Sequence, residues 1–541
     1  MKKKLTTLLC LVLVVSVVLC GCDLVDVEEY MQRLGGALSS GGGTHYSEME
    51  YTRPDIPALE QTLAESCRIG RTSSDIDAVL DGVYAYYDCY DEFYNNMLLA
   101  YVKYSADLRD TYWEGEYDYC AEAAATVDGG LEELYYALAE SPIREKLEGE
   151  RYFGEGFFDA YEGENQWDAA FLSLLEQEAE LEGRYYELMG GIEAEEPEEI
   201  YEACFDELAQ LLAELVAKRQ EIAAHMGYES YVNFAYDFYH YRDYTPGQAM
   251  ELTKTIQREL VELYREVNAG DYWDPAMTEC TQNQMIRYVS GCAGEMGGYV
   301  EEAFELMRGK DLWDTEPGEY KLNASFEVFL PTYRVPFVFV NPTGTEYDKL
   351  TLAHEFGHFA HDFVCGGTYA GTDVSEVLSQ GMEYLSLCYS SEDTDDLARM
   401  KAADSLCVYV EQAAYAAFEH QLYSLPREEL TPENIRSLYE QVGLEFGFDS
   451  WDWDSRDFVM MTHYYTEPMY LISYVVSNDT AFQLYQLELA EQGKGLEKYR
   501  EMLRSQETWF LTFVEDMGMV SPFSRQHIQE VRESMTEILM G

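Results

Sequence analysis

The chain has 541 residues, of which 47% are hydrophobic and 14% aromatic, so it can form two or more domain-sized units with a real core. It carries 102 acidic and 36 basic residues, a net charge of −66. This charge argues against nucleic acid and against an anionic lipid surface as partners.

Residues 1–21 have the pattern of a signal peptide, with three lysines at 2–4 and an apolar run over 5–19. The sequence Leu19-Cys20-Gly21-Cys22 then resembles a bacterial lipobox, which predicts cleavage before Cys22 and lipidation of its thiol. The alternatives are an uncleaved anchor and an ordinary signal peptide. We expect the chain to be extracytoplasmic and lipid-anchored to the bacterial cell membrane, its only contact with a membrane.

Residues 22–53 are predicted to be a lipidated tether, because they include the Gly/Ser-rich stretch 35–43. Apolar residues at helical spacing then predict an N-terminal helical lobe over 54–240, and the remaining 241–541 are assigned to a catalytic lobe. The second of these begins with a helix start, Thr245 as the N-cap followed by Pro246.

The nine cysteines that follow Cys22 are odd in number and scattered, without a CxxC motif. They predict neither a disulfide framework nor a cysteine zinc site. We expect most of them to be buried as small apolar residues, and one or two disulfides remain open.

Two short stretches, 324–331 and 335–342, are rich in β-branched and aromatic residues and are bounded by prolines. They predict a small β-sheet directly before the motif described next. An extended peptide could pair with the edge of such a sheet, or the sheet could only support the following helix.

Residues 354–358 read His-Glu-Phe-Gly-His, a HExxH motif. Residues four apart lie on one face of an α-helix, so His354 and His358 can bind one metal ion. Glu355 lies one step round the helix, where it can reach a metal-bound water. Apolar neighbours favour this helix, and the glycines at 366–367 end it. The alternative is a pair of structural histidines on a buried helix.

A catalytic zinc needs three protein ligands and an open position for water, so we expect one Zn²⁺ per chain and a third ligand nearby. A second predicted helix carries Glu376 and Glu383 on one face, and we choose Glu376. Two alternatives remain open: a capping box from Asp373 to Glu376, and Glu383 as the ligand. Otherwise Glu383 would accept a hydrogen bond from a ligand histidine. His361 is seven residues from His354, so we expect it beside the ligands or in packing.

A further polar cluster lies near the C-terminus, where His463, Tyr470 and Tyr474 flank a predicted helix after Pro468. Each could donate a hydrogen bond to a developing oxyanion if the fold brings it to the metal. The alternative is an aromatic helix that only packs in the core.

These motifs resemble the thimet oligopeptidase / oligoendopeptidase F family of zinc metallopeptidases, here in a lipoprotein form and more similar to the bacterial branch. The resemblance rests on residues 351–361, on the helix from Glu376 to Glu383 and on His463 to Tyr474. It covers roughly 200–541 and is strongest over 330–480. Which tyrosine corresponds to which in the family stays open.

The resemblance implies a mainly α, two-lobed, zincin-type fold with a deep central channel and a small sheet beside the HExxH helix. It implies hydrolysis of short peptides, with His354, His358 and Glu376 as zinc ligands and Glu355 as the general base. His463, with Tyr470 or Tyr474, would then hold the substrate or its oxyanion.

Two other functions remain open. A carboxypeptidase or dipeptidyl carboxypeptidase on the same fold would need a basic residue for the free carboxylate, and the sequence does not identify one. A non-catalytic peptide-binding surface lipoprotein would have no need of Glu355, whose presence argues against it.

Overall fold

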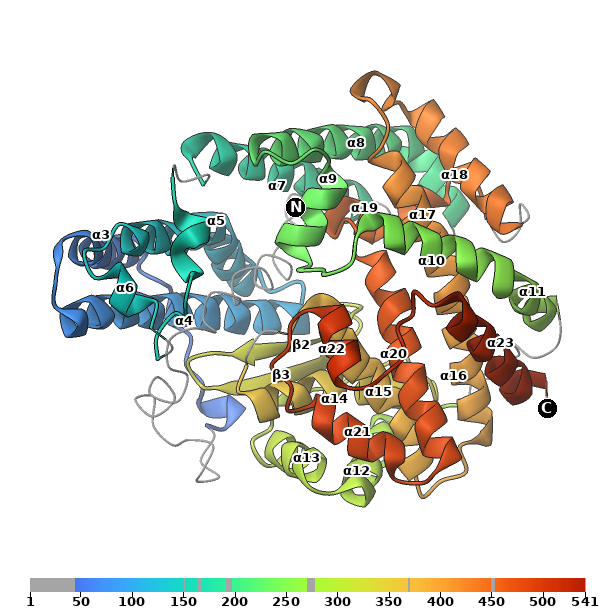
Figure 1. The fold of residues 1–541 in the computed structure, drawn as a ribbon. Helices are drawn as coiled ribbons and strands as arrows, with labels where there is room; N and C mark the ends of the chain where they lie inside the picture. The colour runs from blue at the N-terminus through green and yellow to red at the C-terminus, as the bar shows by residue number, and fades with distance from the viewer. Residues whose placement is uncertain are drawn as a thin grey trace.

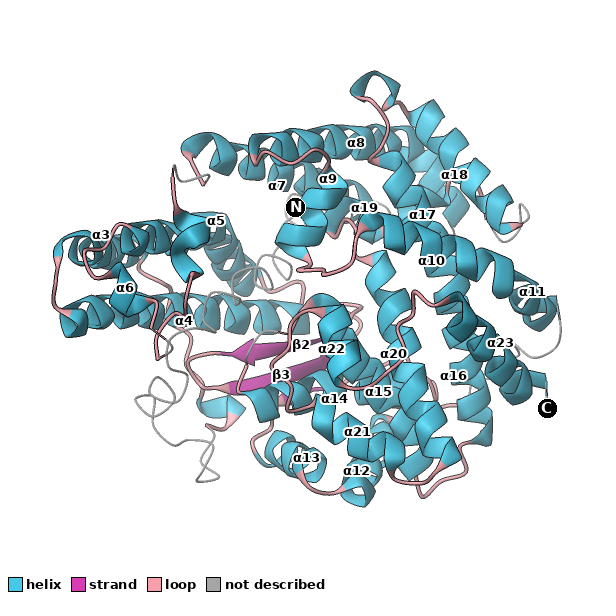
Figure 2. Ribbon diagram, in the orientation of Figure 1, coloured by secondary structure: helices cyan, strands magenta, loops and turns pink. Residues whose placement is uncertain are grey.

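The computed structural model describes residues 44–149, 151–163, 167–190, 197–269, 278–367, 370–448 and 453–540. Within these ranges the chain is mainly helical with one small sheet, which confirms the predicted fold class (Figure 2). No helix in these ranges combines the length and the apolar character needed to span a membrane. The predicted signal peptide and Cys22 lie outside the described residues, and the predicted central channel stays a prediction.

The described end of the predicted tether, residues 44–53, lies against the folded body. Tyr46 donates its backbone N–H to the carbonyl of Lys310 at 2.9 Å, within a short 3-10 helix, η3 (Tyr46–Glu48). Thr52 donates its backbone N–H to Asn96 Oδ1 at 2.7 Å. These contacts fix the chain where it enters the first helix.

The first group of helices has a hydrophobic core of its own, at the left of Figure 1. It contains α3 (Ile56–Thr72), α4 (Ile76–Ala106), α5 (Thr111–Ala139), α6 (Arg144–Leu147) and the 3-10 helix η4 (Phe157–Tyr161). Aspartates cap the first three of these helices by accepting backbone N–H groups, as their preference for the N-cap predicts. Tyrosines four apart on α4, at 86, 90 and 94, are buried in this core. The tyrosine-rich pattern is therefore largely helix packing.

The remaining elements share a second, larger core. Before the sheet they are α7 (Ala169–Gly190), α8 (Pro197–His225), α9 (Tyr231–Phe234), the π-helix η5 (Ala235–Tyr239), α10 (Pro246–Glu259), α11 (Val261–Ala269), α12 (Gln282–Met296) and α13 (Tyr299–Gly309). The predicted start at Thr245 is confirmed, because its hydroxyl accepts from the backbone of Gln248 and Gln248 bonds back to it.

The sheet has three strands in the order β1-β3-β2 among the described residues. They are β1 (Trp313–Asp314), β2 (Ser325–Leu330) and β3 (Val335–Val340). The last two are the predicted strands and pair antiparallel, and β1 adds a short parallel edge that the sequence did not reveal. All six residues of β3 are buried, because helices cover the central strand.

Two helices follow the sheet, α14 (Asp348–Cys365) and α15 (Thr372–Tyr389). The first ends where predicted, at Gly366, whose φ of 70° is the left-handed value that a helix C-cap favours. The later helices complete the core around them (Figure 1). They are α16 (Asp395–Cys407), the π-helix η7 (Val408–Gln412), α17 (Ala413–Leu422), η8 (Arg427–Glu429), α18 (Pro432–Phe446), η9 (Asp457–Met460), α19 (Thr462–Thr466), α20 (Leu471–Ala490), α21 (Lys494–Met502), α22 (Phe510–Asp516) and α23 (Arg525–Met540).

The close approach of α14 to α15 depends on Gly357. A Cβ at this position would lie 2.6 Å from Ser379 Cα and 2.8 Å from the backbone oxygen of Leu378. Backbone atoms cannot move aside as a flexible side chain can, so a methyl group would push the two helices apart.

We therefore expect Gly357→Ala to lower the free energy of unfolding by about 1–3 kcal/mol, as overpacking does. Chemical denaturation measures the change. Gly291→Ala on α12 is the matched control, because its Cβ would meet nothing within 4 Å. It is expected to be neutral or to stabilise by up to about 1 kcal/mol. Equal stability of the two variants would show that the helices do not need this contact.

The nine cysteines after Cys22 are all free thiols. Five of them are buried and four are half-buried, in agreement with the expected role as small apolar residues. The disulfides that the sequence left open are not formed among them.

Candidate metal centre and active site

The structure brings three predicted ligands together at the crossing of α14 and α15. One ligand atom from each of His354, His358 and Glu376 lies within 4.8 Å of the others. His354 Nε2 is 3.6 Å from Glu376 Oε2. Among the described residues, this is the one group of histidine, cysteine and carboxylate side chains with the spacing of a metal site.

Hydrogen bonds at Nδ1 hold both imidazoles. His354 Nδ1 lies 2.8 Å from Glu383 Oε1, and His358 Nδ1 lies 3.0 Å from Ser375 Oγ. Such partners fix the ring orientation and the tautomer of a ligand histidine. Glu383 therefore occupies the position of a hydrogen-bond acceptor behind His354, the second of the two roles considered for it.

Lys401 on α16 extends this arrangement and was not predicted from the sequence. Its Nζ lies 2.8 Å from Glu383 Oε2 and 3.4 Å from Asp404 Oδ2, and its side chain is 4% exposed. A buried lysine must be paired, so it fixes the charge and the rotamer of Glu383. A single lysine without a surrounding motif does not predict a contact with Glu383. Only the structure shows this contact.

Glu383→Gln is expected to weaken zinc binding by about 10–100-fold, because the carboxylate that orients His354 is lost. Competition with a chelator of known affinity measures the change. The substitution also leaves Lys401 without its main counter-charge, so the free energy of unfolding falls as well. Glu392→Gln, which removes a charge that is 47% exposed, is the control. Unchanged zinc affinity in Glu383→Gln would contradict the orienting role.

Burial and neighbouring charges shift the pKa values of this group in opposite directions. Burial raises the pKa of Glu355 to about 7. Burial also lowers the pKa of His354, but the Glu383 hydrogen bond and the nearby carboxylates outweigh it and raise the pKa to about 9. Burial lowers the pKa of His358 to about 4. Burial disfavours the charged form of Glu376, but the two imidazoles lower its pKa overall.

The C-terminal cluster lies directly beside this group, which sequence spacing could not show. Tyr470 donates its hydroxyl to Glu376 Oε1 at 2.7 Å. His463 Nε2 lies 3.3 Å from Tyr474 Oη and 3.3 Å from Glu467 Oε2. His463, Tyr470 and Tyr474 are all partly exposed, unlike the aromatic residues that only fill the core. Glu467 was not predicted, although its i, i+4 spacing from His463 could have suggested the pair.

Two other predictions concern His361 and the capping box from Asp373 to Glu376. His361 is buried and lies 3.3 Å from Asp362 Oδ1, outside the group formed by the three ligand candidates. The alternative capping box is wrong: Gly371 is the N-cap of α15, without a side-chain cap. Asp373 instead accepts a hydrogen bond from the Tyr244 hydroxyl at 2.8 Å. Glu376 therefore does not cap the helix.

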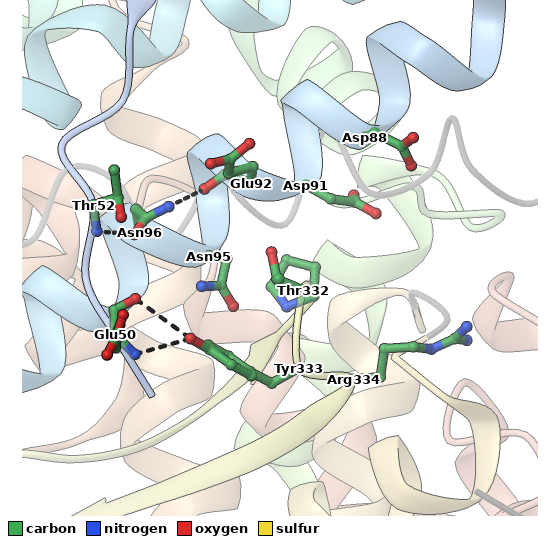
Figure 3. A pocket seen from close by; sticks show the side chains of 11 residues that line it. Glu50, Thr52, Asp88, Asp91, Glu92, Asn95, Asn96, Thr332, Tyr333 and Arg334 are labelled. Atoms are coloured by element: carbon green, nitrogen blue, oxygen red, sulfur yellow. Dashed lines mark hydrogen bonds between the residues drawn. The ribbon is translucent and has the colours of Figure 1, made fainter. Parts of the chain in front are cut away.

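A separate cavity of about 440 Å³ lies between α4, the entering segment 50–52 and the turn after β2 (Figure 3). One face of α4 lines it with Asp88, Asp91, Glu92 and Asn95. None of the predicted site residues lines it. Its carboxylates do not approach one another closely enough to count as a metal group among the described residues. We assign no function to it.

The sequence matches two parts of one peptidase family. Residues 46–167 match the Peptidase M3 N-terminal domain, and residues 300–509 match Peptidase family M3, together more than half of the chain. No curated protein matches the sequence.

Solved structures share the fold. A protein described as an oligoendopeptidase F is 21% identical, with a TM-score of 0.80 over 92% of this chain and 99% of its own. PZ peptidase A, solved with an inhibitor, is 20% identical, with a TM-score of 0.78 over 91% and 99%. Metallocarboxypeptidase 1 of Trypanosoma cruzi is 15% identical, with a TM-score of 0.58 over 89% and 100%.

At such identities the structural likeness shows the fold alone. The family matches go further: they include the helix with the HExxH motif, the helix with Glu376 and the segment with His463. Peptidases of this family are zinc metallopeptidases. The chain therefore belongs to peptidase family M3 and is a peptidase.

Proposed function

We propose that this peptidase is a zinc-dependent oligoendopeptidase that hydrolyses short peptides. The observation that carries the proposal is the convergence of His354 and His358 on α14 with Glu376 on α15, within 4.8 Å of one another. Glu355 lies on the same helix as the two histidines. Two imidazoles and a carboxylate are a donor set of catalytic zinc sites.

The residues around the three ligand candidates fit zinc. Each histidine has its Nδ1 bonded to Glu383 or Ser375, which leaves the two Nε2 atoms for a metal. A zinc ion held there supplies a Lewis acid that lowers the pKa of water to about 7. Its binding would displace the proton that the carboxylates favour on His354.

Glu355 is proposed as the general base. Its side chain is buried beside the ligand candidates, and burial raises the pKa of its carboxyl to about 7. A carboxylate with a pKa near neutral can take a proton from the attacking water and later pass it to the leaving amine. The structure thus suits Glu355 for both proton transfers.

His463, Tyr470 and Tyr474 are proposed to stabilise the substrate oxyanion. Burial holds the pKa of each tyrosine well above its usual value, so both hydroxyls keep their protons. Each hydroxyl donates one hydrogen bond, so Tyr470 can turn to an oxyanion only by releasing Glu376 Oε1. Burial lowers the pKa of His463 to about 4, so its imidazole is neutral and donates from one nitrogen only. Donors fixed before the reaction stabilise negative charge at low cost.

The charges near the site favour the endopeptidase over the carboxypeptidase. A carboxypeptidase must bind a free C-terminal carboxylate with a cation. In the described part of the chain, no lysine or arginine is among the charges that shift the pKa of Glu355, Glu467 or Tyr474. Lys401 and Arg242 are buried and paired with Glu383 and Asp373. This supports cleavage within the peptide.

Peptide digestion followed by mass spectrometry tests the proposal. Peptides with free and with amidated C-termini are incubated with the purified protein, with and without a chelator. We expect internal cleavage of both sets, abolished by the chelator and restored by zinc. Cleavage restricted to the free C-termini would assign a carboxypeptidase. Binding without cleavage would assign the peptide-binding lipoprotein.

We also propose that Cys22 carries the lipid that anchors the chain outside the cytoplasm. The support is the lipobox and the basic and apolar segment before it. Expressed in a bacterium with a labelled fatty acid, the protein should incorporate the label and enter the detergent phase. Cys22→Ser should abolish both. Label in the Cys22→Ser variant would contradict the anchor.

A further inference from the structure

The segment from α19 to the start of α20 is held by buried charges from distant parts of the chain. Arg219 on α8 donates to the backbone oxygens of Tyr464, at 2.9 Å, and of Tyr465. Its own charge is balanced by Glu178 and Glu182 on α7. His240 Nε2 donates to the carbonyl of Pro468 at 2.9 Å. The position of this segment is therefore set from outside it.

Met469 is held on both sides of its backbone. Its φ of 67° is left-handed, an uncommon conformation for a residue with a side chain, and its side chain is buried. The backbone N–H donates to Glu419 Oε1 at 2.8 Å. The carbonyl accepts from Arg242 Nη2, also at 2.8 Å. Both sides of one strained residue are thus held by buried side chains, Glu419 and Arg242.

Arg242 also reaches the helix that carries Glu376. Its Nε lies 3.4 Å from Asp373 Oδ2, and its Nη2 donates to Ser473 Oγ at 2.7 Å. Asp373 lies one helical turn before Glu376, and Met469 immediately precedes Tyr470. Arg242 therefore links the Met469 carbonyl, on one side of the Glu376–Tyr470 hydrogen bond, to the Asp373 carboxylate on the other.

The chain that brings Arg242 to this place is itself irregular. The π-helix η5 ends at Tyr239, and Tyr241 has a left-handed φ of 47°. Such deviations persist only where surrounding contacts maintain them. Irregular backbone on both sides of the Arg242–Met469 contact indicates a constraint beyond helix packing.

We propose that Arg242 is a positioning residue, which holds Tyr470 on Glu376 by fixing the Met469 peptide to the start of α15. This inference rests on the proposed function, because Glu376 is taken as a metal ligand. Arg242 itself need not touch substrate or metal. Its effect reaches the site through the Tyr470 hydroxyl and the Glu376 carboxylate.

The test is a double-mutant cycle with Arg242→Lys and Tyr470→Phe, read as zinc affinity by chelator competition. Loss of a partner that orients a ligand weakens metal binding by about 10–100-fold, and we expect about 10-fold for each single variant. If Arg242 acts through Tyr470, the double variant should lose no more than either single one. Arg308→Lys, at an arginine that is 52% exposed, is the matched control.

A double variant that loses about 100-fold in zinc affinity would show independent effects and would overturn the proposal. A merely structural residue would weaken zinc binding whether or not Tyr470 keeps its hydroxyl. Unchanged zinc affinity in Arg242→Lys would overturn it too. Circular dichroism checks the fold of each variant. If Arg242→Lys does not fold, Asp373→Asn replaces it in the cycle, since it removes the charge that pairs with Arg242 while keeping the shape.

Peptide cleavage separates this inference from the function on which it rests. A wild-type protein that binds zinc but cleaves no peptide refutes the proposed function, and the affinity cycle still decides the role of Arg242. Where cleavage is observed, Arg242→Lys should lower kcat more than it raises KM. A rise in KM alone would contradict positioning through Tyr470.

Discussion

Glu355→Gln is expected to bind zinc as the wild type does and to lose about 10²–10⁴-fold in kcat/KM. The amide has the size of the carboxylate but cannot accept the proton of the attacking water. Zinc binding should survive, because Glu355 lies outside the group formed by His354, His358 and Glu376. The loss should therefore fall on the chemical step.

Cleavage of a fluorogenic peptide and metal analysis of the same preparation measure the two quantities separately. Glu305→Gln is the matched control, because the same change is made at a carboxylate that is 53% exposed on α13. It should leave both quantities unchanged. Full turnover in Glu355→Gln would remove Glu355 from the mechanism. Loss of zinc together with turnover would point to a ligand role instead.

His358→Ala is expected to abolish zinc binding and to lower the activity by at least about 10³-fold. The reason is that a metal ion supplies several kcal/mol of transition-state stabilisation. The remaining candidates, His354 and Glu376, would leave zinc with two protein ligands, fewer than a catalytic site needs. Loss of metal should precede any loss of fold, because Gly357 and its neighbours still pack α14 against α15.

Zinc content after dialysis, and activity after zinc is added back, measure this effect. A chelator should inactivate the wild type reversibly, whereas added zinc should not rescue His358→Ala. His225→Ala, at a partly exposed histidine on α8 that pairs with Asp168 at 3.2 Å, is the control. A His358→Ala protein with a full complement of zinc would refute the ligand assignment.

The sequence predicted those parts of the fold and site that depend on local patterns. Apolar periodicity and a glycine pair gave the helix of His354 and its end at Gly366. Stretches rich in β-branched and aromatic residues and bounded by prolines predicted the strands β2 and β3. The strand β1 was missed, because two residues that pair in parallel with β3 have no periodicity of their own.

Local sequence patterns could not predict contacts between distant segments. Tyr470 is 94 residues from Glu376, and Arg242 is 227 residues from Met469. Lys401 has no motif around it, and only its distance to Glu383 shows what it does. Asp373 and Glu376 fit a capping box in sequence, yet in the fold Tyr244 and Tyr470 bond them instead. Tertiary contacts outweighed the local pattern there.

The most direct test of the central claim is X-ray diffraction from crystals of the zinc-loaded protein, recorded on both sides of the zinc absorption edge. The account predicts one anomalous peak per chain, about 2.0–2.2 Å from the Nε2 atoms of His354 and His358 and from a carboxylate oxygen of Glu376. A peak at another place, or none at the crossing of α14 and α15, would contradict it.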